Sequence, residues 1–239
     1  MRLQSVLAAL VSVGCVLSGA ARAAVLEISP VTISLADGQS ATTIEVRNRG
    51  DTPAAVQVRA YAWAQAGDED VLTSTRDIIL SPPIFTVPAG ESQTLRLLSR
   101  GGAATTGERS YRLLLDEVPA ATPHPQQIII ALRASLPVII AAAPPASNRL
   151  QWRADRAAGG EVLLSATNAG PGYDAVQAIV VTLADGSRRS AVARGKNPYI
   201  LAGAERHWVV DGGRVPAGAL RLNVSTRNGK SEHALALAP

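Results

Sequence analysis

The sequence predicts an all-β protein made of two sandwich domains in tandem. Short runs of Val, Ile, Leu and Thr alternate with Gly, Pro, Asn and Asp turns at intervals of roughly ten residues, a spacing typical of β-sandwiches. Helical periodicity does not persist beyond two turns anywhere in the chain. The 239 residues are also enough for two domains, each of about 100 residues with its own core.

The predicted strands fall into two groups on either side of a linker. The first group covers residues 25–35, 41–48, 54–64, 76–80, 92–98, 109–118 and 128–140. Residues 141–148 (AAAPPASN) are small, uncharged and contain prolines, so we expect a linker there. The second group covers residues 149–155, 161–167, 174–183, 188–193, 206–210, 219–226 and 231–237. Asn228-Gly229 predicts a tight hairpin turn before its last strand.

The N-terminus has the pattern of an export signal. Arg2 supplies a positive charge, and residues 6–17 form an apolar run that is too short to span a bilayer as a helix. An A-x-A cleavage motif ends at Ala23. We therefore expect a signal peptide at residues 1–23, cleavage near Ala23/Ala24, and a mature chain in the envelope of a Gram-negative bacterium or in the medium.

The mature chain has no cysteine and little net charge. The single cysteine, Cys15, lies in the expected signal peptide, and Ser12 stands where a lipoprotein signal would carry an aliphatic residue. The core alone therefore has to stabilise the fold. Removing Arg2 and Arg22 leaves 21 basic and 19 acidic residues, too small an excess to predict binding to nucleic acid or to a membrane surface. No second apolar run is long enough to predict membrane insertion.

Residues typical of catalysis or metal binding are scarce. The three histidines, His124, His207 and His233, are not at metal-ligand spacing with one another. The sequence has neither a G-x-S-x-G elbow nor a glycine loop for phosphate. The acidic cluster Asp68–Asp70 is more typical of a solvated hairpin tip than of a cation site. We therefore expect no enzyme activity, no metal and no cofactor.

One predicted strand is more apolar than a half-exposed strand requires. Within residues 126–140 (QQIIIALRASLPVII), the even positions form one apolar face at period two. The odd positions begin apolar with Ile129 and then become Arg133, Ser135 and Pro137. Proline cannot donate to a ladder and favours an edge strand or a bulge. The residues alone leave two possibilities: a strand buried on both faces, which is favoured, or an edge that offers an apolar row to a partner.

Segments of the first domain resemble periplasmic pilus-assembly chaperones of the PapD-like superfamily. Residues 28–50 (ISPVTISLADGQSATTIEVRNRG) are similar to the first two strands of that family. Residues 81–98 (SPPIFTVPAGESQTLRLL) are similar to its proline-pair, P-x-G and arginine-bearing region. Residues 108–119 (ERSYRLLLDEVP) and 128–140 (IIIALRASLPVII) resemble its F and G strands, in forms similar to those of archaic, spore-coat-U-type pilus chaperones.

The resemblance implies a fold and a function. The fold is two immunoglobulin-like β-sandwich domains in an L or boomerang arrangement, with boundaries at 24–142 and 143–239. The function is that of a non-enzymatic chaperone that binds, folds and caps pilin subunits by donor-strand complementation and delivers them to an outer-membrane usher. Self-association of the free chaperone through its exposed edges is a further possibility. A structural pilus subunit or adhesin, or a secretion accessory of the same fold, is the alternative.

The resemblance also implies which residues contact the pilin. It places the lent apolar row on Ile128, Ile130 and Leu132, with Ile129 and Ala131 facing the chaperone's own sandwich.

A second set of residues should hold the C-terminal carboxylate of the pilin. The family uses an arginine in the first strand and a lysine after the donor row, but Thr32 and Pro137 occupy these positions here. Arg96 and Arg133 are therefore the candidate carboxylate anchors, because a guanidinium can form two charge-assisted bonds to a carboxylate.

Overall fold

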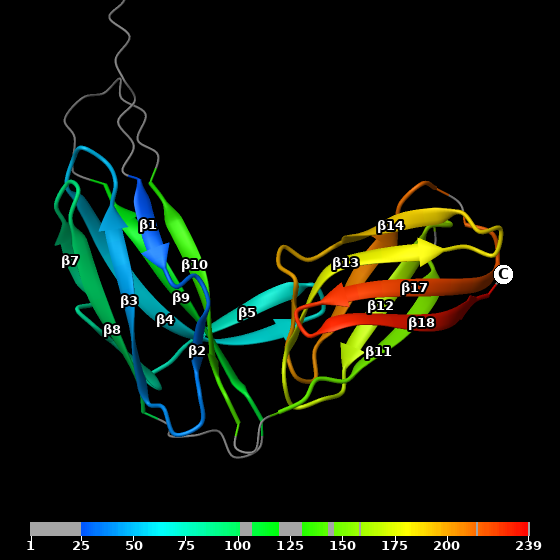
Figure 1. Ribbon diagram of the computed structural model, residues 1–239, viewed down its shortest axis with the longest axis horizontal. Coiled ribbons are helices and arrows are strands. Elements are labelled where there is room, and N and C mark those ends of the chain that lie inside the picture. Colours follow the sequence, from blue (N-terminus) through cyan, green and yellow to red (C-terminus); the bar gives the residue numbers. More distant parts are fainter. Residues whose placement is uncertain are drawn as a thin grey trace, which may run out of the picture.

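The computed structural model describes two β-sandwich domains, set at an angle that gives the molecule the shape of a boomerang (Figure 1). This arrangement confirms the predicted fold class. No helix in the described part of the chain is long and apolar enough to cross a membrane. The described residues are 25–100, 107–119, 131–142, 146–157, 159–213 and 215–238.

The first domain consists of two sheets. Its strands are β1 (Leu26–Ser29), β2 (Ile33–Leu35), β3 (Ala41–Asn48), β4 (Ala54–Ala66), β5 (Glu69–Ser74), β6 (Ile78–Ser81), β7 (Ile84–Val87), β8 (Ser92–Ser99), β9 (Arg109–Val118) and β10 (Arg133–Ile140). One sheet has the strand order β1-β3-β8-β6. The other has the order β2-β10-β9-β4-β5, with β7 also paired to β4.

Side chains at period two build the core between these sheets. In β3 and β8, Ile44, Val46, Leu95 and Leu97 are fully buried, whereas the positions between them are exposed. Successive side chains of a strand point to opposite faces, so each strand contributes one apolar row to the core. The buried residues of both sheets form one hydrophobic cluster.

The prediction of one strand over residues 25–35 is wrong, because the chain changes sheets within that segment. β1 pairs antiparallel with β3 in one sheet, whereas β2 pairs parallel with β10 in the other. Pro30, which has no N–H to donate to either ladder, lies between them. The crossing leaves β1 and β2 at the edges of their two sheets.

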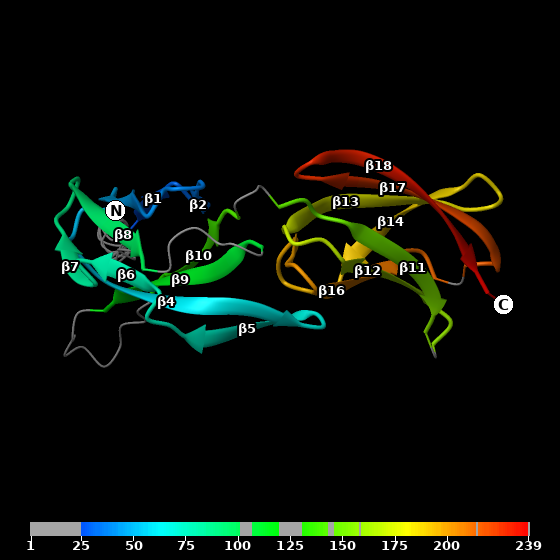
Figure 2. The ribbon, with the colours of Figure 1, turned by 90° about the horizontal axis from the view of Figure 1, so that it is seen from below.

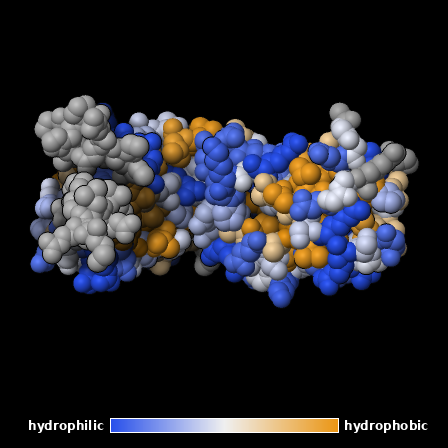
Figure 3. Space-filling model, turned by 90° about the horizontal axis from the view of Figure 1, so that it is seen from above, coloured by the Kyte–Doolittle hydropathy of each residue, from blue (hydrophilic) through white to orange (hydrophobic). Residues whose placement is uncertain are grey.

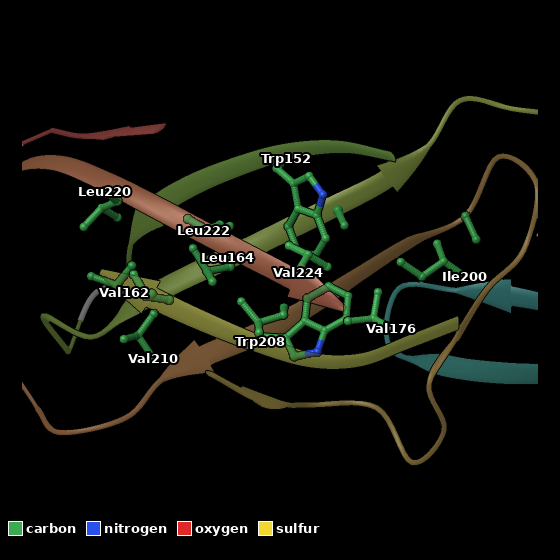
Figure 4. Close-up of a cluster of buried hydrophobic side chains, with 14 of the residues drawn as sticks. Trp152, Val162, Leu164, Val176, Ile200, Trp208, Val210, Leu220, Leu222 and Val224 are labelled. Atoms are coloured by element: carbon green, nitrogen blue, oxygen red, sulfur yellow. The ribbon is translucent and has the colours of Figure 1, made fainter. Parts of the chain in front are cut away.

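The second domain has its own core. Its strands are β11 (Leu150–Arg156), β12 (Val162–Asn168), β13 (Asp174–Thr182), β14 (Arg188–Ala193), β15 (Tyr199–Ile200), β16 (Glu205–Val210), β17 (Gly218–Thr226) and β18 (Gly229–Leu237). β14 joins the two faces of this sandwich, because its first half pairs with β13 and its second half with β16. Trp152, Leu164, Trp208 and Leu222 are among the apolar side chains that fill the interior (Figure 4).

Most strands lie where the sequence predicts them, but β5, β7 and β15 were not predicted. All six residues of β5 are exposed, so it has no apolar alternation from which a strand could be recognised. β17 and β18 form the hairpin expected near Asn228-Gly229, and the two residues of its turn are Arg227 and Asn228.

Candidate functional site

β10 has an unpaired edge over more than half of its length. β9 pairs with the whole strand on one side, whereas β2 covers only Val138–Ile140 on the other. In the described ranges, no strand pairs with this second edge from Arg133 to Pro137. An unpaired edge presents main-chain N–H and C=O groups to which another strand can be added.

Two hydrogen bonds identify which residues direct their main chain towards this edge. The Glu117 N–H of β9 donates to the Leu132 C=O at 2.9 Å, whereas the Ala141 N–H donates to the Leu35 C=O beside β2 at 2.9 Å. The N–H and C=O groups of one strand residue point to the same side, and successive residues alternate. The odd-numbered residues from 133 to 137 therefore direct their main chain towards the free edge.

Pro137 fits this alternation. As an odd-numbered residue, it lacks an N–H on the free side of β10, so the ladder with β9 loses no hydrogen bond. The association of this proline with an edge, predicted from the sequence, is confirmed.

The side chains of β10 divide the strand into two parts. From Leu136 to Ile140 every residue is buried, with Val138 in the core of the first domain and Ile139 against the core of the second. At the start of the strand, Arg133 and Ser135 are exposed. Both possibilities left open by the sequence are therefore partly correct: the strand is buried on both faces at its end and open at its beginning.

The even positions of β10 form its inward row. Ala134, Leu136, Val138 and Ile140 pack in or against the first core. Ala131 is exposed, so the prediction that it faces the chaperone's own sandwich is wrong. Strand alternation fixes this outcome, because a core row at even positions turns the odd positions outwards.

A second free edge lies next to that of β10. β1 ends its own sheet and pairs only with β3 among the described strands, and it lies beside β10 in Figure 1. Leu26 and Ile28 of β1 and Ala134 of β10 are only partly buried against the first core. Hydrophobic residues reach the surface of this domain beside the grey atoms in Figure 3. We call the edges of β1 (Leu26–Ser29) and β10 (Arg133–Pro137) the open side.

The predicted donor residues lie at the start of β10 or before it. Leu132 immediately precedes the strand and is 40% exposed. Ile128 and Ile130 lie outside the described residues, as do the expected signal peptide and His124.

The structure does not bring the two candidate anchors together. Arg96 lies in β8, in the sheet that does not contain β10, and points outwards between the buried Leu95 and Leu97. Arg133 begins β10 on the open side.

Arg133 already has an acidic partner, and a second arginine shares it. Asp116 of β9 accepts a hydrogen bond from Arg133 of β10 and another from Arg59 of β4. The hydrogen bond from Arg133, followed by that from Arg59, holds the pKa of Asp116 below its ordinary value against the opposing effect of burial. Sequence reasoning missed Arg59, because only the strand order places it near the start of β10.

A different cluster joins the two domains at the tip of the β4–β5 hairpin, which reaches the second domain (Figure 2). Asp70 accepts hydrogen bonds from Arg206 Nη2 at 2.8 Å and from Asn197 Nδ2 at 2.7 Å. Asp68 Oδ1 accepts the His207 main-chain N–H at 2.9 Å, and its Oδ2 lies 3.0 Å from His207 Nδ1. The predicted hairpin tip is confirmed, but two of its carboxylates also bind the second domain, which the prediction did not include.

Arg112 adds an aromatic contact to this interdomain joint. Its guanidinium carbon lies 3.7 Å from the centre of the Trp63 ring, and Trp63 meets Tyr199 of the second domain edge-on at 5.3 Å. Such a desolvated cation–π contact is worth on the order of 2 kcal/mol. Burial lowers the pKa of Arg112, although Asp70 at 3.5 Å partly offsets this effect. The buried side chain of Arg112 therefore has a structural role.

A second contact fixes the joint on the side of β9. The Glu108 N–H donates to the Pro171 C=O at 3.1 Å, and its carboxylate accepts the Tyr173 N–H at 2.7 Å. Burial raises the pKa of Glu108, more than the Tyr173 hydrogen bond and the charge of Arg227 lower it. The joint therefore includes polar contacts from two separate segments of the first domain, in addition to the aromatic contact.

The unpaired strand edges of the first domain offer a binding surface. Within the described ranges, no three His, Cys, Asp or Glu side chains are grouped so that they could hold a metal ion. The site that stands out is the open side, with two unpaired strand edges over a partly exposed core.

The family comparison agrees with this geometry. The profile of the pili and flagellar-assembly chaperones, PapD N-terminal domain, matches residues 25–145, which is half of the chain. The chain belongs to this family of pilus chaperones. Members of the family are periplasmic and act without catalysis. No curated protein matches the chain by sequence.

Solved pilus-chaperone structures share the two-domain fold. The chaperone–tip subunit complex CsuC–CsuE from archaic Csu pili of Acinetobacter baumannii matches at 23% identity and a TM-score of 0.66, covering 90% of this chain and 100% of the other. The E. coli chaperone DraB matches at 18% identity and a TM-score of 0.61, covering 91% of this chain and 98% of the other. The Salmonella enterica complex of pilin SafA with chaperone SafB matches at 20% identity and a TM-score of 0.61, covering 90% of this chain and 96% of the other.

Asp70→Asn tests the interdomain joint of this pilus chaperone. The change leaves the buried Arg206 without its carboxylate, so we expect the free energy of unfolding to fall by about 1–3 kcal/mol. Partial burial raises the pKa of Asp70, but the surrounding hydrogen bonds and the Arg112 charge lower it below the ordinary 3.8. The ionised carboxylate therefore stabilises the fold fully above pH 3.8 and loses its effect as the pH falls through the lowered value.

Urea unfolding of both proteins between pH 3 and pH 7 measures this difference. Glu69→Gln, at the exposed neighbouring position, is the control and should match the wild type. Equal stability of Asp70→Asn and wild type at pH 7 would show that the joint does not depend on this carboxylate.

Proposed function

We propose that this protein is a chaperone that binds pilin subunits by lending them a strand, formed by the segment from Ile128 to the start of β10. The observation that supports this function is the open side, where β10 has a free edge from Arg133 to Pro137. A pilin that lacks its last strand exposes unpaired edges and an apolar groove, both of which favour aggregation. A lent strand covers both.

Related complexes support this choice of partner. CsuC–CsuE is described as a chaperone–tip subunit pre-assembly complex, and SafB was solved with the pilin SafA. By analogy, pilin subunits are the clients of this chain and an outer-membrane usher receives them. No step of this transfer requires catalysis or a cofactor from the chaperone.

The lent row consists of Ile128, Ile130 and Leu132. These residues continue, at period two, the inward row of β10 that begins with Ala134. One apolar row then serves two cores, that of the chaperone at its end and that of the pilin at its beginning. Each of the three side chains would contribute roughly 1.5–3 kcal/mol when fully buried, before the costs of association are subtracted.

Arg133 is the better placed of the two candidate anchors for the pilin carboxylate. It lies directly after the donor row and on the open side, whereas Arg96 points outwards from the opposite sheet. Asp116 binds the Nε of Arg133, so the Nη groups of the guanidinium are the donors that would bind the carboxylate of the pilin.

The remaining features of the proposal concern export and organisation. Residues 1–23 act as the signal peptide, with cleavage near Ala23/Ala24 delivering the chain to the periplasm. The chaperone domain spans 24–142 and the second domain 143–239. The exposed edges of the open side also provide a route for self-association when no pilin is bound.

Replacing Ile128, Ile130 and Leu132 together with Asp tests the donor row. We expect the variant to fold, because Leu132 is exposed outside both cores and the proposed donor role places Ile128 and Ile130 in the same row. It should fail to protect a pilin of the same bacterium from degradation, since charged side chains cannot enter an apolar groove. The measurement is the yield of pilin that co-purifies with the chaperone from the periplasm.

A triple Asp substitution of the exposed residues Val71, Leu72 and Thr73 in β5 is the matched control. It also places three charges on a sheet edge and should leave the pilin yield unchanged. An unchanged yield with the donor-row variant would rule out this assignment and favour a pilus subunit, an adhesin or a secretion accessory.

Arg133→Gln and Arg96→Gln distinguish the two candidate anchors. Arg133→Gln should weaken pilin binding by roughly tenfold, because it removes a charge-assisted pair. Arg96→Gln should bind the pilin as tightly as the wild type does. The dissociation constant of each chaperone for the pilin is the measured quantity. The reverse order would transfer the anchor to Arg96.

A further inference from the structure

Two neighbouring carboxylates of β9 hold the junction between the lent segment and β10. Glu117 binds the main chain of Leu132, and Asp116 binds the side chain of Arg133. Leu132 and Arg133 are the last donor residue and the first residue of β10, so both contacts lie where the proposed lent segment meets the sandwich.

Glu117 replaces one rung of the ladder. Because Arg133 faces Asp116 in the β9–β10 register, Leu132 faces Glu117. Two such residues of an antiparallel hydrogen-bonded pair normally exchange two main-chain bonds. Here the Glu117 N–H donates to the Leu132 C=O at 2.9 Å, but the Leu132 N–H donates to the Glu117 side chain, Oε2, at 3.1 Å. The side chain therefore ends the ladder and keeps the amide of Leu132 bound.

Asp116 ties the same point to the rest of the sheet. Its two carboxylate oxygens accept one hydrogen bond from β10 and one from β4, through Arg133 and Arg59. The carboxylate is 14% exposed, whereas the arginine side chains are 64% and 44% exposed. One carboxylate thus connects three neighbouring strands on the outer face of the sheet, next to the free edge.

These contacts restrict the backbone without covering the donor side chain. Leu132 is 40% exposed although both its N–H and its C=O are bound to Glu117. An edge that is ordered before a partner arrives loses less conformational entropy on binding than a mobile one. We propose that Asp116 and Glu117 are positioning residues that fix the direction and register of the donor strand before the pilin binds.

This inference rests on the proposed function, because the strand they position is the one lent to the pilin. It adds that the rate of capture depends on two residues that need not touch the pilin. Neither residue would be found from an apolar pattern, since they act through hydrogen bonds to Leu132 and Arg133.

The test compares Glu117→Ala, which removes the acceptor, with Glu117→Gln, which retains a side-chain oxygen. In the free chaperone, amide hydrogen exchange at Leu132 should become roughly threefold to tenfold faster in Glu117→Ala, the range expected for one lost hydrogen bond. The rate constant for association with a pilin of the same bacterium should fall by a similar factor. The dissociation rate constant should stay the same, and Glu117→Gln should restore most of both effects.

Asp116→Ala is a second variant with an independent contact and should also slow association. Glu232→Ala, which removes an exposed carboxylate paired with Arg221 in the second domain, is the control and should change neither quantity. Unchanged exchange at Leu132 and unchanged association in both Glu117→Ala and Asp116→Ala would overturn the inference. The donor-row variant separates this result from a failure of the proposed function, because it abolishes pilin capture only if β10 is lent.

Discussion

The strand β10 completes the core of the first domain and also provides a free edge on the open side. The rest of the structure depends on this double role. The even side chains of β10 complete the first core, while its odd main-chain groups face the free edge from Arg133 to Pro137. The period of two makes both possible in one segment, because side chains and hydrogen bonds point in perpendicular directions. A one-residue shift of register would turn Leu136 and Val138 out of the core.

The ends of β10 are held by different means. At its C-terminal end, β2 pairs with it and the second domain packs against Ile139. At its N-terminal end, β9 is the one described strand that pairs with it, assisted by Asp116 and Glu117. The interdomain joint therefore supports the buried half of the strand and leaves the other half accessible. The ionic and aromatic contacts of Asp70, Arg112 and Trp63 give this joint a defined geometry.

The sequence predicts the two-domain fold and most of the strands, because alternation and turn residues are local signals. It also indicates the unusual strand, since Ile128, Ile130 and Leu132 belong to an apolar row of even positions. That row continues after the odd positions become polar at Arg133. The joint could not be predicted. Asp68 and Asp70 look like ordinary hairpin residues, and their partners Arg206 and His207 lie more than 130 residues away.

Other features depended on strand order, which a single sequence does not contain. Arg59 and Arg133 are separated by β9, and only the sheet places both beside Asp116. The orientation of Ala131 was predicted wrongly for a similar reason. Its neighbours are apolar in both phases, and only the observed core shows that the even phase is the inward one.

Residue-resolved amide hydrogen exchange of the chaperone, alone and bound to its pilin, tests the central claim most directly. The lent edge predicts that the amides of Arg133 and Ser135 become protected in the complex, because their N–H groups face the free edge. The amides of Ala134 and Leu136 face β9 and should change little. Protection of β5 instead, with Arg133 and Ser135 exchanging as in the free protein, would contradict the account.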